Sequence, residues 1–305
     1  MEIAELLAPL FLLILAGAVL HRVGLLPVEI IGGINRLLYW VGLPAVVFHS
    51  LAIADDVGGT MGPLLAVLVI ATCASVGLAW SWSALLRIAP AGRGTFVQAA
   101  FRGNLSFIGL PLLLTVPGVP TGPAVMAMAP MLIIYNAVAV ASLLASQHRS
   151  NASMWSTIGR QIVRNPIIAS SVAGAAWHYA GWSLPKWAER SLASLAEMAL
   201  PLALLCIGAA LLTVPLRGNH RIATVAALHK TVVSPAIGYG IGRLLGLDAP
   251  SLLAALLCLA CPTAAVSYTM VKQLGGDEAV AASTVVLSAL LAVPVLAVIL
   301  AWFAV

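Results

Sequence analysis

Apolar residues fill this chain in long blocks, and only short polar connections separate one block from the next. A helix needs roughly 20 apolar residues to cross the hydrocarbon core of a bilayer. Ten blocks approach or exceed this length, so the pattern predicts an all-α polytopic membrane protein with ten transmembrane helices. The expected spans are 3–20, 34–54, 62–86, 95–116, 122–146, 162–182, 191–213, 222–245, 249–274 and 279–303.

The composition excludes a soluble protein of this size. Of the 305 residues, 62% are hydrophobic and 8% are charged, whereas soluble domains carry about 25% charged residues. A soluble fold with so few charges could not cover its surface with polar groups. The net charge of +5 does not indicate nucleic-acid binding, because the basic residues are scattered and form no basic stripe.

The basic residues instead predict an orientation. The front of the first block carries Glu2 and Glu5, and His21-Arg22 follow the block, which is the reverse of a cleavable signal peptide. With the N-terminus outside, ten of the 15 Lys and Arg residues fall at cytoplasmic ends of spans: Arg22, Arg36, Arg87, Arg93, Arg149, Arg160, Arg164, Arg217, Arg221 and Lys272. Lys186, Arg190 and Arg243 fall at outer ends. This bias predicts a multi-pass membrane protein with both termini outside.

Two of the expected spans contain sequences that break a helix. Residues 101–111, FRGNLSFIGLP, combine two glycines, a proline, an asparagine and a serine inside an apolar block. Residues 261–268, CPTAAVSY, form a second break in the other half of the chain. In lipid, an opened backbone survives only inside protein or beside a wet cavity. Broken helices near the middle of the membrane hold the substrates of many transporters.

The two halves of the chain show matching landmarks. Gly42-Leu43-Pro44 in the second span corresponds to Ala199-Leu200-Pro201 in the seventh, and the breaks lie in the fourth and the ninth. Because five spans is an odd number, the second half is inverted relative to the first. The pattern predicts five-helix repeats at 1–148 and 162–305, joined by a cytoplasmic linker at 149–161.

Several stretches together resemble the auxin efflux carrier family, in particular its bacterial members described as malonate, malate or other organic-acid permeases. They are GLPAVVF at 42–48, GNLSFIGLP at 103–111, RNPII at 164–168, PLALLCIGAAL at 201–211, PTA at 262–264 and KQLGGD at 272–277. The resemblance covers nearly the whole chain in the right order. Members of the family often have an asparagine a few residues after the proline of the ninth span, where this chain has Val266 followed by Ser267.

The resemblance implies a ten-helix fold similar to those of bile-acid symporters and sodium/proton antiporters. Helices 1, 2, 6 and 7 would form a scaffold, and helices 3–5 and 8–10 a mobile transport domain in which the broken helices 4 and 9 cross. It further implies a homodimer in the lipid bilayer that works as an elevator, a small organic anion as substrate, and a proton or sodium as a possible coupling ion.

Polar groups at the breaks are the first candidates for substrate binding. The asparagine amide offers two donors and an acceptor, and the ends of broken helices carry a partial positive charge that suits an anion. An equally simple interpretation is that Asn104 only satisfies the opened backbone, and that hydroxyl groups bond back to their own helix. The break residues in this set are Pro44, Asn104, Ser106, Pro262, Thr263, Ser267 and Tyr268.

Ionisable residues within spans form the second set of candidates, because burying a charge in a membrane is costly. Arg102 adjoins the first break and could hold a substrate carboxylate or extend to lipid headgroups. Lys230 could neutralise an anion in the transport domain. His49 and Glu197 are candidates for coupling a proton or another cation, with structural roles as the alternative.

Motifs for other chemistry are absent from the sequence. It contains no H-E-x-x-H, G-x-S-x-G, Walker A or dinucleotide-binding motif. Cys258 and Cys261 form a single C-x-x-C without a second pair, so packing is the simpler interpretation. We therefore expect no catalytic residue, metal or cofactor. The leading hypothesis is a secondary transporter of small organic anions such as mono- or dicarboxylates; the alternatives are a sodium-coupled symporter of the bile-acid type and an intramembrane hydrolase.

Overall fold

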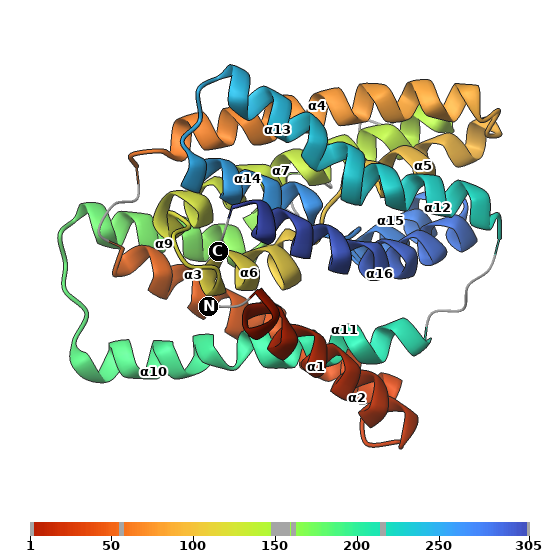
Figure 1. The fold of residues 1–305 in the computed structure, drawn as a ribbon. Helices are drawn as coiled ribbons and strands as arrows, with labels where there is room; N and C mark the ends of the chain where they lie inside the picture. Colours follow the sequence, from red (N-terminus) through yellow and green to blue (C-terminus); the bar gives the residue numbers. More distant parts are fainter. Residues whose placement is uncertain (1–2, 55–57, 148–158, 160–162, 214–217, 304–305) are drawn as a thin grey trace.

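The computed structural model describes residues 3–54, 58–147, 159, 163–213 and 218–303, which fold almost entirely into helices (Figure 1). The predicted all-α architecture is confirmed for this part of the chain. The helices are α1 (Ile3–Arg22), α2 (Val28–Leu37), η1 (Leu38–Gly42), α3 (Leu43–Ala52), α4 (Met61–Leu85), α5 (Pro90–Phe101), η2 (Leu105–Gly109), α6 (Leu110–Thr115), α7 (Thr121–Ser146), α9 (Pro166–Tyr179), α10 (Lys186–Glu197), α11 (Ala199–Thr213), α12 (His220–Leu228), η3 (His229–Val233), α13 (Ser234–Leu244), α14 (Ala249–Ala260), α15 (Val266–Leu274) and α16 (Glu278–Trp302).

The lengths of the helical stretches fit a membrane protein. Within the described residues, 5 stretches are long and apolar enough to cross a bilayer: Val28–Ala52, Met61–Leu85, Thr121–Ser146, Lys186–Thr213 and Glu278–Trp302. Shorter apolar helices lie at Leu12–Arg22, Leu105–Thr115 and Ala249–Ala260. Every block that the hydropathy pattern predicted as a span therefore contains helix where the structure describes it.

Three segments with π-helical hydrogen bonding, η1, η2 and η3, share one feature in the sequence. Each is followed by an α-helix with proline as its second residue, namely Pro44, Pro111 and Pro235. Proline has no backbone N–H and its ring clashes with the carbonyl of the preceding turn. Widening that turn into a π-bulge relieves the clash while the helix continues.

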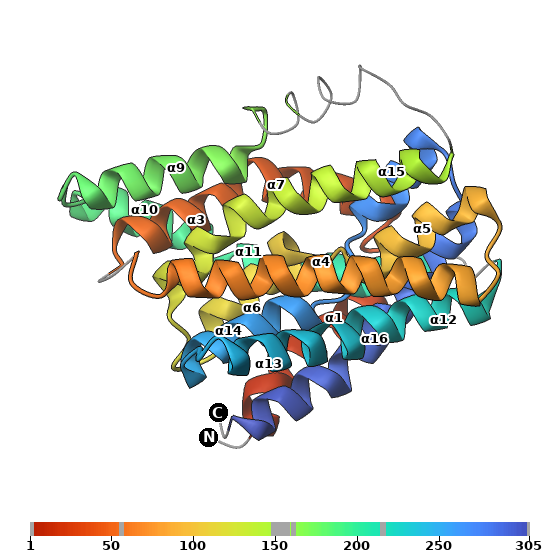
Figure 2. The same cartoon turned by 90° about the horizontal axis from the view of Figure 1, so that it is seen from above.

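The helices form two groups, and each group contains elements from both halves of the chain. The first helix group consists of α1, α2, η1, α3, α9, α10 and α11, and within it α1 packs along α11 and α3 along α9. The second helix group consists of α4 to α7 and α12 to α16. In Figure 1, α1, α2, α10 and α11 lie along one edge, opposite α4 and α13. Seen from above (Figure 2), α4 runs between α7 and α13.

The pair α1 and α11 is held at close range by two glycines. A Cβ atom on Gly17 would lie 2.0 Å from the carbonyl oxygen of Leu205, and one on Gly208 would lie 1.8 Å from that of Ile14. Any larger residue would push the two helices apart. Small residues at such contacts are the usual way for membrane helices to gain van der Waals contact, since no hydrophobic effect operates between helices in lipid.

The two breaks predicted from the sequence meet in the second helix group. Gly103 and Thr263 form an isolated antiparallel bridge. The backbone N–H of Asn104 donates to the carbonyl of Pro262 at 2.8 Å, and that of Ala264 donates to the carbonyl of Arg102 at 3.0 Å. The opened backbones therefore satisfy each other away from water, which is the requirement for non-helical chain at membrane depth. We call this pair of extended segments the crossing.

Candidate substrate cavity

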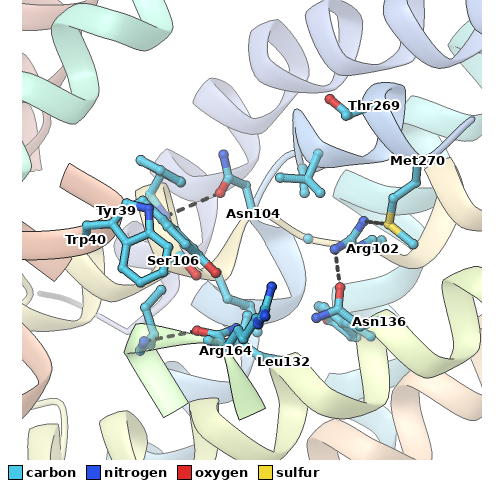
Figure 3. A pocket seen from close by; sticks show the side chains of 18 of the residues that line it. Tyr39, Trp40, Arg102, Asn104, Ser106, Leu132, Asn136, Arg164, Thr269 and Met270 are labelled. Atoms are coloured by element: carbon cyan, nitrogen blue, oxygen red, sulfur yellow. Dashed lines mark hydrogen bonds between the residues drawn. The ribbon is translucent and has the colours of Figure 1, made fainter. Parts of the chain in front are cut away.

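A cavity of about 510 Å³ lies against the crossing (Figure 3). Its wall combines η1 of the first helix group with the crossing, α7 and α15 of the second, and with the start of α9. The lining residues are Tyr39, Trp40, Arg102, Gly103, Asn104, Leu105, Ser106, Phe107, Leu132, Tyr135, Asn136, Arg164, Asn165, Ile167, Ala264, Val266, Thr269, Met270 and Gln273. A space of this size is typical of small-molecule sites, which occupy about 300–1,000 Å³.

Arg102 places a guanidinium in the cavity wall. It is the C-cap residue of α5 and is only 7% exposed. Its Nη2 donates to the side-chain oxygen of Asn136 on α7, and its Nη1 lies against the sulfur of Met270 on α15 (Figure 3). The side chain is thereby fixed between three helices rather than extended to the membrane surface, so the lipid-headgroup alternative does not hold.

Asn104 begins the helical segment on the other side of the break. Its side-chain oxygen accepts a hydrogen bond from the backbone N–H of Phe107 at 3.3 Å, which makes it the N-cap of η2. This contact confirms the structural role considered for Asn104, and it leaves the Nδ2 amide without a hydrogen-bond partner among the described residues. Asn104 and Ser106, at the N-terminal end of this helical segment, both line the cavity.

A second positive charge reaches the cavity from α9. Asn165 caps this helix, accepting from the backbone N–H of Ile167 at 3.0 Å and from that of Ile168 at 3.4 Å. Arg164 directly precedes this cap, is exposed, and is among the lining residues. Figure 3 shows Arg164 and Arg102 at different places around the cavity.

The charged residues that line the cavity are all basic. Two arginines contribute to it, together with the amides of Asn104, Asn136, Asn165 and Gln273, and none of the lining residues is acidic. Of the described side chains, the only buried charged ones are Arg102 and Lys230. Positive charge and amide donors in a partly enclosed space favour an anionic ligand.

Several predicted site residues build the crossing itself. The hydroxyl of Thr263 donates to the carbonyl of Ala99 at 2.8 Å, and its backbone N–H donates to Ser288 Oγ at 2.9 Å. Pro262 supplies the carbonyl that pairs with Asn104. Lys230 is fully buried behind the crossing and donates to the carbonyl of Leu259. The structure therefore gives these three residues a structural setting and does not place them in the cavity lining.

The remaining candidates lie elsewhere. Ser267 is buried, and the Tyr268 hydroxyl is 3.4 Å from a carboxylate oxygen of Glu278, away from the cavity. Pro44 lies in the first turn of α3. His49 lines a different cavity, of about 580 Å³, ten residues further along the helical stretch that contains Tyr39. Glu197, the last residue of α10, is exposed.

Some lining residues carry little sign of a binding role in the sequence. Asn136 interrupts the apolar block of α7, and this lone amide within a span was the available signal. Arg164 and Asn165 belong to a stretch that carries the family resemblance, but the charge pattern indicates only a cytoplasmic helix end for Arg164. Tyr39 and Trp40 had no polar signal, because aromatic residues in spans are usually packing residues.

Comparison with known proteins agrees with this geometry. The family model described as "Membrane transport protein" matches residues 2–300. The chain belongs to this membrane transport protein family, which is the auxin efflux carrier family indicated by the motifs. Among curated relatives, a protein of Rhizobium meliloti (strain 1021) named "Putative malonate transporter" is 27% identical over an alignment 305 residues long, and this alignment covers 96% of this chain and 93% of the relative. A member of the membrane transport protein family acts in a membrane on a small molecule.

Proposed function

We propose that this protein is a secondary transporter that moves small organic anions, such as mono- or dicarboxylates, across the cell inner membrane. The observation that carries the proposal is the cavity at the crossing, to which Arg102 and Arg164 contribute positive charge and no lining residue contributes negative charge. A broken-helix crossing is where secondary transporters bind their substrates.

The donor set suits carboxylates in particular. A guanidinium binds a carboxylate through two parallel N–H···O bonds, and amide N–H groups can bind the remaining lone pairs. Two arginines at separate points of one cavity fit a molecule with two carboxylates. The relative from Rhizobium meliloti is named for malonate, a dicarboxylate, which makes malonate the first compound to test.

Alternating access by an elevator movement of the second helix group against the first is supported by the contact between them. A small cavity of about 100 Å³ lies at this contact, and all its lining residues are apolar: Ile14, Ile108, Leu112, Leu200, Leu204, Ile207, Leu211, Pro262, Ala289, Leu290, Ala292, Val293 and Leu296. By contrast, the side-chain hydrogen bonds of Arg102, Thr263 and Lys230 all join elements of the second helix group. An apolar contact can slide without breaking hydrogen bonds.

The two larger cavities fit such a movement. The substrate cavity includes Arg164 and Gln273, which belong to ends of helices that the charge bias assigns to the cytoplasm. The cavity at His49 lies between the end of α3 and the segment that joins α6 to α7, which the ten-span topology assigns to the outside. In this account the structure is open to the cytoplasm, and the movement of the second helix group would carry the crossing toward the outer side.

A binding screen tests the substrate class. Purified protein in detergent should melt at a higher temperature in the presence of malonate or other small carboxylates, because a ligand of the folded state stabilises it by mass action. Amides and alcohols of the same size serve as matched neutral controls and should have no effect. A stable protein that responds to none of the carboxylates, or equally to the neutral compounds, contradicts the proposal.

A further inference from the structure

The ammonium group of Lys230 lies directly behind the crossing, next to Gly103. The side chain is 0% exposed, and Nζ donates to the carbonyl of Leu259. A Cβ atom built on Gly103 would lie 3.1 Å from Lys230 Cε and 3.3 Å from Nζ. The absence of a side chain at Gly103 therefore makes room for the lysine next to the bridge between the two breaks.

No carboxylate accompanies this charge in the part of the chain that the structure describes. The described acidic residues of the second helix group, Asp248, Asp277 and Glu278, are all exposed. The ammonium instead lies at the C-terminal end of α14, where the last carbonyls have no intrahelical partner and carry a partial negative charge. The carbonyl of Leu257 in this turn accepts from Cys261 Sγ at 3.1 Å, and the carbonyl of Leu259 is left to Lys230.

The local backbone fixes the lysine in this position. Lys230 is the second residue of the π-helical segment η3, in which His229, Lys230 and Thr231 are consecutive and buried. His229 Nε2 lies 2.9 Å from Ser75 Oγ on α4, and Thr231 Oγ1 donates to the carbonyl of Ala227 at 2.9 Å. The contact of His229 with α4 fixes this segment, so the Lys230 side chain is directed to one place.

Carbonyls at the ends of broken helices are the groups that coordinate sodium or a proton in cation-coupled transporters. A lysine ammonium is a compact cation with three donors, so it can take the place of a bound monovalent cation at such carbonyls. We propose that the Lys230 ammonium permanently occupies the place of a bound monovalent cation at the crossing. The carrier therefore binds no coupling sodium there, and removing the ammonium opens a site for a free monovalent cation. The statement on coupling rests on the proposed transport function.

Two variants separate the cation site from simple packing. Lys230→Ala removes the charge and leaves space, whereas Lys230→Met removes the charge and fills the space with apolar atoms. Melting temperatures are measured without substrate in sodium chloride and in N-methyl-D-glucamine chloride of equal ionic strength. We expect sodium to raise the melting temperature of Lys230→Ala by about 3 °C or more, and to leave wild type and Lys230→Met unchanged. Ethylammonium chloride should act on Lys230→Ala as sodium does.

Two results would overturn the proposal: a sodium-dependent shift in wild type equal to that of Lys230→Ala, or a folded Lys230→Ala protein that responds to neither cation. If Lys230→Ala does not fold, the melting temperatures of wild type in the two salts test the proposal on their own. An ammonium that occupies the site requires these temperatures to be independent of sodium. Uptake by wild type in proteoliposomes should likewise persist within about twofold when N-methyl-D-glucamine replaces sodium. Absence of uptake in every medium would count against the transport function, and the melting experiments would still decide the role of Lys230.

Discussion

Arg102 and Asn136 are joined by a hydrogen bond from the guanidinium Nη2 to the side-chain oxygen, which ties the end of α5 to the middle of α7. The contact holds a buried positive charge in the wall of the candidate substrate cavity. Because Asn136 orients the guanidinium and does not neutralise it, the charge remains available to an anion. This arrangement makes Arg102 the residue whose replacement should affect binding most.

Replacing Arg102 with glutamine should raise the substrate concentration for half-maximal uptake by about 10- to 100-fold. A hydrogen bond to a charged group is worth about 1.5–3 kcal/mol, which corresponds to that range. Arg102→Lys keeps the charge but loses the planar pair of donors, so we expect an intermediate effect. Arg243→Gln, at an exposed position of α13, is the control and should behave as wild type. Equal affinities in all folded variants would remove Arg102 from the binding site.

Two replacements of Asn104, by Asp and by Ser, distinguish an effect on folding from an effect on substrate binding. Asp and Ser can both cap η2 as Asn104 does, so both variants should melt within a few degrees of wild type. Asp adds a negative charge beside the anion, and at an effective dielectric near 20 such a repulsion amounts to about 4 kcal/mol at 4 Å. Substrate affinity should therefore fall at least about tenfold in Asn104→Asp and much less in Asn104→Ser. Unaltered affinity in a stable Asn104→Asp protein would exclude the first break from the substrate site.

Much of the architecture follows from hydropathy and from helix-breaking residues. Apolar blocks locate the helices, and the Gly, Pro and Asn residues at 101–111 and 261–268 locate the breaks, because these residue types disrupt helical hydrogen bonding wherever they occur. The pairing of Gly103 with Thr263 agrees with the expectation that the breaks cross. Arg102, Asn104 and Ser106 lie in the cavity because they belong to one of these breaks.

The surroundings of side chains far from a break depend on how the helices pack, and the sequence pattern does not indicate this packing. Lys230, like Arg102, is a basic residue inside a predicted span. The π-helical segment η3 directs its side chain to the carbonyl of Leu259 and not into the cavity. Arg164 looks like an ordinary residue at a membrane surface until the start of α9 is placed beside the crossing. The periodicity of the sequence predicts neither the position of Lys230 nor that of Arg164, because both positions follow from contacts between distant segments.

The contact between α1 and α11 predicts a strong effect of adding a single methyl group. Gly17→Ala would place its Cβ 2.0 Å from the carbonyl oxygen of Leu205, and overpacking of this kind costs about 1–3 kcal/mol. Gly32→Ala on α2 is the matched control, because nothing lies within 4 Å of its Cβ position. In detergent, Gly17→Ala should lower the melting temperature and Gly32→Ala should maintain or raise it. The reverse order would contradict the described packing of the first helix group.

Thr263 should affect stability without affecting substrate affinity. Thr263→Val removes the donor to the carbonyl of Ala99, and leaving that buried acceptor unpaired costs about 1–3 kcal/mol. Thr263→Ser keeps the hydroxyl and should stay close to wild type. Melting temperature and carboxylate affinity are measured on the same preparations. A Thr263→Val protein with normal stability but weakened affinity would show that the hydroxyl binds substrate.

Uptake of radiolabelled malonate into proteoliposomes that contain only this protein tests the transport of small organic anions most directly. We predict saturable uptake above that of empty liposomes, competed by unlabelled mono- or dicarboxylates and not by neutral compounds of the same size. Arg102→Gln should reduce this uptake, and Arg243→Gln should not. If malonate is not transported, labelled members of the carboxylate panel replace it. Folded wild-type protein that transports none of them, or transports neutral compounds equally well, would contradict the account.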